Sequence, residues 1–371
     1  MKVLFISHEA TRTGAPIALL QELQYIRSHC KQIEPSVYFI RGGELLGDFE
    51  QLCPIYKGWI DNHLIKRLFS RFDFPDRWLL HVFQRKTFDC IYANSVVSFE
   101  KGLMFKNKLG VRLIGHVHEA ECLMQEFHIE PALLANFDQF ITVSKLAAEN
   151  LINHYAVPSE QVFIQHPVSL WVSRLLMKEI SVEAYDYHED AKLIGCFCNA
   201  EWAKATDVIP LFLHRFIEKY PEQHCKLVLI GNMSRDYSYL LDYVLRKMNL
   251  RERVIFVGGV DNPLNYIAPL DMLLLLSREE SFGLAAQEAA IMGKPIIGFL
   301  DATGAAEWIS QGAGLLVPFM DLGKMADAVN TILSDEKLKE KLGSQAKAIV
   351  EEMYENDSKM ENVICVVRKN H

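Results

Sequence analysis

The sequence predicts an α/β protein with two doubly wound domains. Its 371 residues exceed what one ordinary hydrophobic core accommodates, so two domains are expected. Short apolar runs typical of buried strands alternate with stretches of helical spacing, which indicates parallel sheets covered by helices on both faces. Several strands end in polar, glycine-containing loops that lead directly into helices. Ligand-binding loops are therefore expected at the carboxyl ends of the strands.

Composition and charge argue against nucleic-acid binding, a disulfide or metal framework and a membrane-spanning helix. Residues 1–168 carry 17 Lys and Arg against 18 Asp and Glu, and residues 169–371 carry 22 against 29. Nucleic-acid binding favours a strong basic bias, which neither half has, so we expect no nucleic-acid partner. The eight cysteines lack disulfide or metal-ligand spacing, and no apolar run reaches the roughly 20 residues of a membrane helix. We therefore expect a cytoplasmic protein.

The N-terminal half begins with an expected strand over residues 2–7, a polar loop that contains Gly14, and a helix from residue 17. This order is typical of a ligand-facing turn, although the G-x-G-x-x-G fingerprint is absent. Further expected elements are strands over 36–40, 88–94, 111–115 and 137–144 and a helix over 145–154. The strand at 111–115 leads into His116 and His118. A histidine just past the end of a parallel strand lies where such sheets bind ligands.

Residues 62–88 alternate basic and aromatic side chains. A segment of this kind can lie on an anionic membrane surface, which would add a peripheral location at the inner face of the membrane. It can equally be a core helix whose Lys and Arg side chains reach to solvent. Both interpretations stay open at this point.

The C-terminal half contains the stretch around which the chain is organised. A strand expected over 272–276 runs into residues 277–290, which have the pattern of a strand-to-helix junction. Free backbone N–H groups and the helix dipole favour an anion there, and Gly283 lets a ligand come close to the backbone. Two carboxylates, Glu280 and Glu288, bracket this junction. Further elements are strands at 192–198, 226–231 and 253–260 and helices at 209–220 and 322–371.

Glu280-x-Phe282-Gly283 followed by Glu288 resembles the E-x7-E element of retaining nucleotide-sugar glycosyltransferases with the GT-B architecture, known as group 1 or family 4. The resemblance implies two Rossmann-like domains facing across a cleft. It places an acceptor-side domain at 1–168, a linker at 169–191, a nucleotide-sugar-binding domain at 192–350 and a helix at 351–371 that crosses back to the first domain. It implies that a sugar moves from a UDP- or GDP-sugar to a glycan or lipid-linked acceptor with retention of configuration, without a metal or cofactor.

The resemblance also assigns roles to individual residues. Glu280 stabilises the oxocarbenium-like sugar or fixes its hydroxyls, His118 orients the sugar, with His116 as the lesser candidate, and Glu288 binds the ribose. The expected donor-binding residues are Gly14, Asn199, Lys204, Gly259, Val260, Arg278, Phe282, Gly283, Leu284 and Glu288.

One departure from the family pattern leaves alternatives open. The family has an Arg after the first strand of the second domain and a Lys-Gly pair five residues later, which together neutralise the donor diphosphate. This chain keeps Lys204 but has Asn199 and Ala205 at the other two positions, with Arg278 as a candidate substitute cation. Asn199 and Ala205 suggest a catalytically weak nucleotide-sugar-binding protein as one alternative. Another enzyme of GT-B architecture, such as a sugar-nucleotide epimerase, is the second.

Overall fold

The computed structural model describes the chain except residues 59–81, 199–201, 358–359 and 369–371. It divides into an N-terminal unit, Met1–His166 with Lys359–His371, and a C-terminal unit, Pro167–Ser358. Residues 169–191, predicted as a linker, group with the C-terminal unit, and they contain the helix α9 (Leu170–Leu176). The domain limits at 168, 191 and 350 stay predictions.

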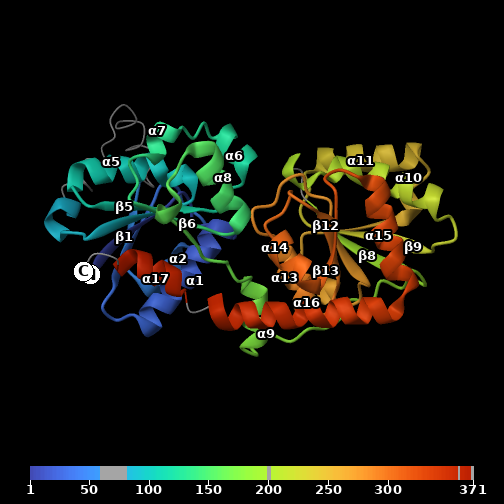
Figure 1. Ribbon diagram of the computed structural model, residues 1–371. Coiled ribbons are helices and arrows are strands. Elements are labelled where there is room, and N and C mark those ends of the chain that lie inside the picture. The colour runs from blue at the N-terminus through green and yellow to red at the C-terminus, as the bar shows by residue number, and fades with distance from the viewer. Residues whose placement is uncertain (59–81, 199–201, 358–359, 369–371) are drawn as a thin grey trace. The chain divides into compact units, whose positions relative to one another are not determined.

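The N-terminal unit is a parallel sheet with helices on both faces (Figure 1). Among the described residues its seven strands lie in the order β3-β2-β1-β4-β5-β6-β7. The strands are β1 (Lys2–Ser7), β2 (Glu34–Phe39), β3 (Ile55–Lys57), β4 (Cys90–Asn94), β5 (Arg112–Val117), β6 (Gln139–Thr142) and β7 (Val162–Ile164). The helices are α1 (Gly14–His29), α2 (Leu46–Leu52), α5 (Phe99–Leu109), α6 (Glu121–Glu126), α7 (Pro131–Leu134), α8 (Lys145–Tyr155) and α17 (Glu361–Arg368), with short turns η1 (Val96–Ser98) and η2 (Ser159–Gln161).

The two faces of this sheet have separate apolar cores. One core joins the sheet to α1, α2 and α17, and the other joins it to α5, α6, α7 and α8. Because helices cover both faces, the strands are continuous apolar runs without polar alternation, and Val3, Leu4, Phe5 and Ile6 are all fully buried. This pattern made the strands recognisable in the sequence.

The basic and aromatic segment at 62–88 lies largely outside the described residues. Its described aromatic side chains are core residues: Phe83 is fully buried and Phe88 nearly so. The Phe83 ring makes edge contacts with Tyr38, Tyr56 and Phe105. The membrane interpretation is therefore wrong for these two phenylalanines, and for residues 62–81 it stays a prediction.

The C-terminal unit repeats the architecture with six parallel strands in the order β10-β9-β8-β11-β12-β13, counted over its described residues. The strands are β8 (Lys192–Phe197), β9 (Cys225–Ile230), β10 (Val254–Gly258), β11 (Met272–Leu275), β12 (Ile296–Phe299) and β13 (Gly314–Val317). The helices are α9, α10 (Ile209–Lys219), α11 (Arg235–Lys247), α12 (Pro263–Ile267), α13 (Leu284–Ile291), α14 (Ala306–Trp308), α15 (Leu322–Ser334) and α16 (Glu336–Asp357). The short turns are η3 (Trp202–Lys204), η4 (Thr206–Val208), η5 (Arg251–Arg253) and the π-helical η6 (Ile309–Ala313).

The helices of this unit also lie on two faces. Buried side chains of α10, α11 and α15 share one core with the strands, while α13 packs against α12 and α16 on the other face (Figure 1). The short helix α13 is enclosed by these neighbours: six of its residues are buried, and two of the six, Gln287 and Glu288, are polar. The predicted strand-to-helix junction thus leads into the interior of the unit.

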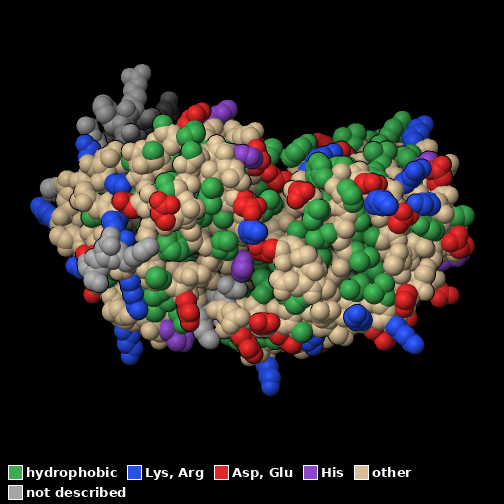
Figure 2. Space-filling model, in the orientation of Figure 1, with side chains coloured by type: hydrophobic (Ala, Val, Ile, Leu, Met, Phe, Trp, Pro, Cys, Tyr) green, Lys and Arg blue, Asp and Glu red, His purple; other side chains and the backbone are tan. Residues whose placement is uncertain are grey.

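Both sheets reverse their strand order once, at β1/β4 and at β8/β11. Ligands of open parallel sheets bind beyond the carboxyl ends of the strands at such reversals. The loops after β8 and β11 carry Lys204, Arg278, Glu280, Phe282 and Gly283, and Gly14 begins the helix that follows β1. No helix in the described part of the chain is both long enough and apolar enough to span a membrane. Figure 2 shows acidic and basic side chains interspersed over the visible face.

Candidate functional site

The C-terminal unit brings together two loops that are far apart in the sequence. The loop after β8 carries Lys204 and the loop after β11 carries Glu280, and the two strands are neighbours in the sheet. The loops are also bonded to each other, because the Arg278 and Glu279 amides donate to the Ala203 carbonyl at 2.7 and 3.3 Å. The structure therefore places two predicted site residues side by side.

Lys204 and Glu280 form an ion pair through Nζ and Oε2. Their side chains are only 26% and 17% exposed, so both charges lie at the protein surface but are partly shielded from water. The Lys204 ammonium is therefore partnered by the Glu280 carboxylate. An anion that enters here competes with that carboxylate for the lysine.

The candidate substitute cation, Arg278, is bonded elsewhere. Its Nη1 and Nη2 donate to the two carboxylate oxygens of Asp207 at 2.8 and 2.7 Å. This paired geometry lowers the pKa of Asp207 below its ordinary value. The guanidinium also donates to the Trp202 carbonyl and lies 5.3 Å from the Trp202 ring centroid. Arg278 thus holds the two loops together.

The junction itself has the backbone geometry that its sequence predicts. Gly283 has φ +87°, a left-handed conformation that favours glycine, and it directly precedes Leu284, the first residue of α13. No side chain caps this helix, so its first N–H groups point toward the end of the sheet. Phe282 is buried under the loop, and the Gly304 amide donates to the Glu280 carbonyl at 2.8 Å, which fixes the position of Glu280.

Glu288 is buried one turn into α13. Ser169 Oγ donates to Glu288 Oε1 at 2.7 Å, and the neighbouring Gln287 accepts from the Ser169 amide at 2.8 Å and donates to the Pro167 carbonyl at 3.1 Å. Burial raises the pKa of Glu288 to about 7, and the Ser169 hydrogen bond partly offsets that rise. At neutral pH this carboxyl is therefore more readily protonated than an exposed glutamate. Its Ser169 partner also caps α9 and lies in the segment predicted as a linker, so sequence reasoning missed it.

Gly259 and Val260 follow the end of β10 and are respectively exposed and half-buried. A Cβ atom at Gly259 would lie 2.1 Å from Asn232 Oδ1, which explains the glycine. A cavity of about 380 Å³ lies next to this loop, and its lining includes Asn232, Arg251 and Gly258. The lining residue Gly258 directly precedes Gly259, and both predicted nucleobase contacts stay predictions.

The structure describes one of the two residues that depart from the family pattern, Ala205, and not the other, Asn199. Ala205 is fully buried and has φ +49° and ψ 35°, the left-handed conformation for which glycine is the usual residue. The loop after β8 therefore keeps a glycine-like backbone at Ala205, although the residue has changed.

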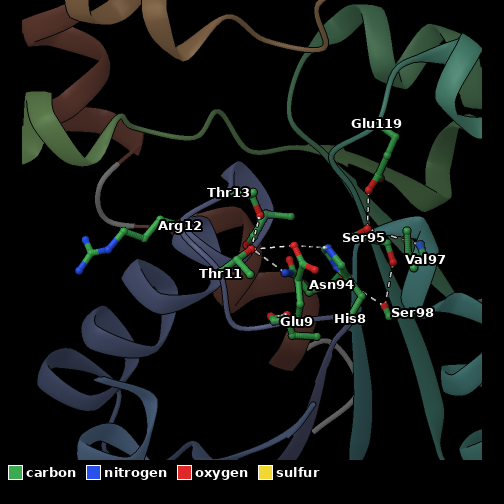
Figure 3. A network of polar contacts seen from close by, with 12 residues as sticks. His8, Glu9, Thr11, Arg12, Thr13, Asn94, Ser95, Val97, Ser98 and Glu119 are labelled. Atoms are coloured by element: carbon green, nitrogen blue, oxygen red, sulfur yellow. Dashed lines mark hydrogen bonds and ion pairs between the residues drawn. The ribbon is translucent and has the colours of Figure 1, made fainter. Parts of the chain in front are cut away.

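In the N-terminal unit, Gly14 is the exposed first residue of α1 and follows a polar loop. In this loop Thr11 Oγ1 donates to Glu9 Oε1 at 2.7 Å and lies 3.0 Å from Thr13 Oγ1 (Figure 3). A Cβ atom at Gly14 would meet no heavy atom within 4 Å, so folding alone does not require glycine there.

His118 follows β5 directly and is half-buried, and its Nε2 lies 2.8 Å from Asn94 Oδ1. Its backbone amide donates to Glu119 Oε2 at 3.0 Å, and the Val96 amide donates to the same carboxylate. Figure 3 shows the third donor to Glu119, the hydroxyl of Ser95. Burial raises the pKa of Glu119, and these donors offset part of the rise. Burial and the nearby His116 and His8 hold the pKa of His118 well below its ordinary value. The ring is therefore neutral near pH 7.

His116 is a residue of β5 itself and is buried, so it does not reach the strand end. Its Nδ1 lies 2.7 Å from the Tyr92 hydroxyl and 3.3 Å from Glu22 Oε1. Desolvation raises the pKa of Glu22 to about 8 and lowers that of His116 to about 3. Burial therefore disfavours the charged form of both side chains and opposes an ion pair between them. The N-terminal site thus rests on a buried polar layer that the sequence did not reveal.

No group of three or more His, Cys, Asp or Glu is placed to hold a metal ion among the residues that the structure describes. The polar partners that sequence reasoning missed are Asn94, Ser95, Ser169 and Asp207. Asn94 had a recognisable signal, since it is the polar last residue of an apolar strand.

Comparison with known proteins relates this geometry to a family. Residues 186–349 match the model of Glycosyl transferases group 1. N-acetyl-alpha-D-glucosaminyl L-malate synthase of Bacillus anthracis is 34% identical over 174 residues, 47% of this chain and 44% of that protein. D-inositol 3-phosphate glycosyltransferase of Kribbella flavida is 25% identical over 288 residues, 70% of this chain and 66% of that protein. The matched segments thus span less than two thirds of these relatives.

The fold is similar to solved structures over nearly the whole chain. Anabaena Alr3699/HepE in complex with UDP and glucose superposes with a TM-score of 0.74 at 18% identity, covering 98% of this chain and 99% of that one. The lipopolysaccharide outer core galactosyltransferase WaaB gives a TM-score of 0.76 at 16% identity, with 99% of each chain covered. The predicted GT-B fold is confirmed. The family match is confined to residues 186–349, less than half of the chain, and the solved structures show likeness of fold.

Proposed function

We propose that the chain transfers a sugar from a UDP- or GDP-sugar to a glycan or lipid-linked acceptor, with retention of configuration and without a metal ion. The observation that carries the proposal is the strand-to-helix junction at β11 and α13, where Lys204, Glu280 and the uncapped helix start come together. An ammonium group and free backbone amides suit a diphosphate, and the neighbouring carboxylate suits sugar hydroxyls. Structures of Anabaena HepE with UDP and UDP-glucose add support for a nucleotide-sugar donor.

The donor diphosphate takes Lys204 from its ion pair with Glu280. The released carboxylate then faces the sugar, where it stabilises developing positive charge or fixes a hydroxyl. The bond between the anomeric carbon and the diphosphate breaks with its electron pair on the departing phosphate oxygen. The acceptor oxygen bonds to the same carbon from the same face, and its proton passes to that phosphate oxygen.

Glu288 binds the ribose in this proposal, and the loop at Gly259 and Val260 contacts the base. The remaining donor-site residues are Gly14, Arg278, Phe282, Gly283 and Leu284, together with Asn199, which lies outside the described residues. Of these, Arg278 acts through its bonds to Asp207 and Trp202, which hold the two loops together.

A catalytically weak nucleotide-sugar-binding protein is the second candidate, because Arg278 is bonded to Asp207 and does not replace the family's usual arginine. A thermal-shift screen with UDP, GDP, ADP and the corresponding nucleotide-sugars, followed by a donor-hydrolysis assay, distinguishes the transferase from the binding protein. Stabilisation by one nucleotide indicates binding to the native state. Stabilisation with donor turnover supports the transferase, and stabilisation without turnover supports the binding protein. No stabilisation by any nucleotide contradicts both.

Contact with a membrane through residues 62–81 is a separate proposal, which the alternation of basic and aromatic residues supports. Sedimentation with vesicles of anionic lipid at low salt tests it. Binding that salt weakens is the expected result, and a protein that stays in the supernatant at low salt contradicts the proposal.

A further inference from the structure

Three neighbouring strands of the N-terminal unit present side chains to one another at their carboxyl ends. Asn94, the last residue of β4, is paired in register with Ser7 of β1 on one side and with His116 of β5 on the other. Asn94 is fully buried, whereas His118, just past the end of β5, is half-buried. His118 is thus a partly exposed side chain that is hydrogen-bonded to this buried polar layer.

The orientation of the Asn94 amide is fixed by the backbone of α1. Asn94 Nδ2 donates to the carbonyl of Ala15 at 2.9 Å, so its Oδ1 is directed toward Nε2 of His118, at 2.8 Å. If the amide were turned over, its oxygen would face the Ala15 carbonyl oxygen with no proton between them, and a buried acceptor pair of that kind is unfavourable. The amide therefore has one favourable orientation.

That orientation decides where His118 carries its proton. Asn94 Oδ1 can only accept a hydrogen bond, so Nε2 of His118 must be the protonated nitrogen. In a neutral imidazole the other nitrogen, Nδ1, then carries a lone pair. Among the described residues none is hydrogen-bonded to Nδ1, so the protein leaves this lone pair unused in the part of the chain described.

The surroundings keep the ring neutral and in place. The His116 ring lies under the His118 ring with centroids 3.9 Å apart and is itself held by Tyr92, with Glu22 of α1 behind it. His8 from the end of β1 also disfavours a positive charge on His118, and burial does so most. Glu119, the acidic group nearest in sequence, is occupied by Ser95 and two backbone amides. A neutral His118 presents an acceptor and no positive charge.

We propose that Asn94 is a positioning residue that fixes His118 as a hydrogen-bond acceptor at Nδ1, so that this histidine takes a hydroxyl group of the ligand and not a phosphate oxygen. A phosphate oxygen is also an acceptor and would meet the Nδ1 lone pair unfavourably. The identity of that hydroxyl as a sugar hydroxyl rests on the proposed function. The tautomer itself does not, since it follows from contacts within the N-terminal unit.

The tautomer is read directly by long-range ¹H–¹⁵N correlation spectra of the full-length protein labelled with ¹⁵N-histidine. The His118 signals are identified by their loss in His118→Gln. The expected spectrum at pH 7 shows a protonated Nε2 and an unprotonated Nδ1. Asn94→Asp should place a carboxylate on Nε2 and shift the ring toward the doubly protonated form at pH 6, while Asn107→Asp on the exposed part of α5 should change nothing. A wild-type ring protonated at Nδ1 overturns the proposal, whether or not Asn94→Asp folds.

The ligand class is tested separately with UDP-glucose and its singly deoxygenated analogues. One of these analogues should lack the hydroxyl that donates a hydrogen bond to Nδ1 of His118. The wild-type protein should hydrolyse that analogue at least about tenfold more slowly than UDP-glucose, whereas His118→Ala should show no such difference. Equal losses in both proteins overturn the assignment of that hydroxyl. If no donor is turned over while the spectrum shows the expected tautomer, the proposed function fails and the role of Asn94 stands.

Discussion

Replacing Glu288 by glutamine should make the unliganded protein more stable at alkaline pH and weaken its binding of nucleotide. The pKa of this carboxyl is raised from 4.5 to about 7 in the folded protein. Stability that is present below pH 4.5 is therefore lost as the pH rises to about 7, because the unfolded chain ionises first. At 1.36 kcal/mol per pKa unit, the loss amounts to about 3 kcal/mol.

Glutamine does not titrate, and its oxygen still accepts from Ser169 Oγ. Wild type and Glu288→Gln should therefore unfold similarly at pH 4.5, whereas at pH 8 the variant should unfold at a temperature roughly 6–12 °C higher. Differential scanning calorimetry at both pH values measures this, with the exposed α16 residue changed in Glu340→Gln as the control. A variant that is less stable than wild type at pH 8 would refute the reasoning on desolvation.

Glu288→Gln should also lower the affinity for nucleotide, although it raises the stability of the folded protein. A carboxylate accepts two strong hydrogen bonds from a ribose diol, whereas an amide offers one acceptor without charge. Losing one charged hydrogen bond weakens binding by about 1.5–3 kcal/mol, or roughly ten- to a hundredfold. Calorimetric titration with the nucleotide selected by the screen should show this loss. Unchanged affinity would remove the ribose-binding role from Glu288.

Three further substitutions test other parts of the account. Lys204→Met should weaken UDP or GDP binding about tenfold or more in calorimetric titration, while Lys204→Arg should retain most of it; equal binding by both variants would contradict the diphosphate contact. Gly14→Ala should leave thermal stability unchanged or slightly higher, as should the matched helical control Gly47→Ala, and only the first should slow donor turnover. Phe83→Ala should lower the free energy of unfolding by about 3–5 kcal/mol in urea titration, and a change below about 1 kcal/mol would show that Phe83 is no core residue.

The elements that the sequence predicted well are those whose local pattern is decisive. Buried parallel strands are continuous apolar runs, so β1, β8 and β11 stand out, and the junction before α13 combines an apolar strand, Gly283 and a helix. Strand ends were less reliable: the strand expected to end at Gly115 runs to Val117, which makes His116 a buried strand residue. The helix α9 was missed because seven residues with mixed polarity show no clear period.

Pairings between distant loops could not be predicted, because they depend on strand order. Lys204 and Glu280 are 76 residues apart in sequence and meet because β8 and β11 are neighbours. Similarly, Asn94 reaches His118 because β4 and β5 are neighbours. The sequence indicated candidate site residues, and the sheet topology decides which of them lie side by side.

We propose that this chain moves a sugar from a nucleotide-sugar donor to an acceptor with retention of configuration. Real-time NMR of donor hydrolysis, with the sugar of the selected nucleotide-sugar labelled with ¹³C, tests that claim most directly. We expect release of the nucleoside diphosphate together with a sugar whose first-formed anomer matches that of the donor, and loss of this reaction in Glu280→Gln. A first-formed sugar of the opposite anomer, an epimerised donor, or no turnover of any donor that binds would contradict it.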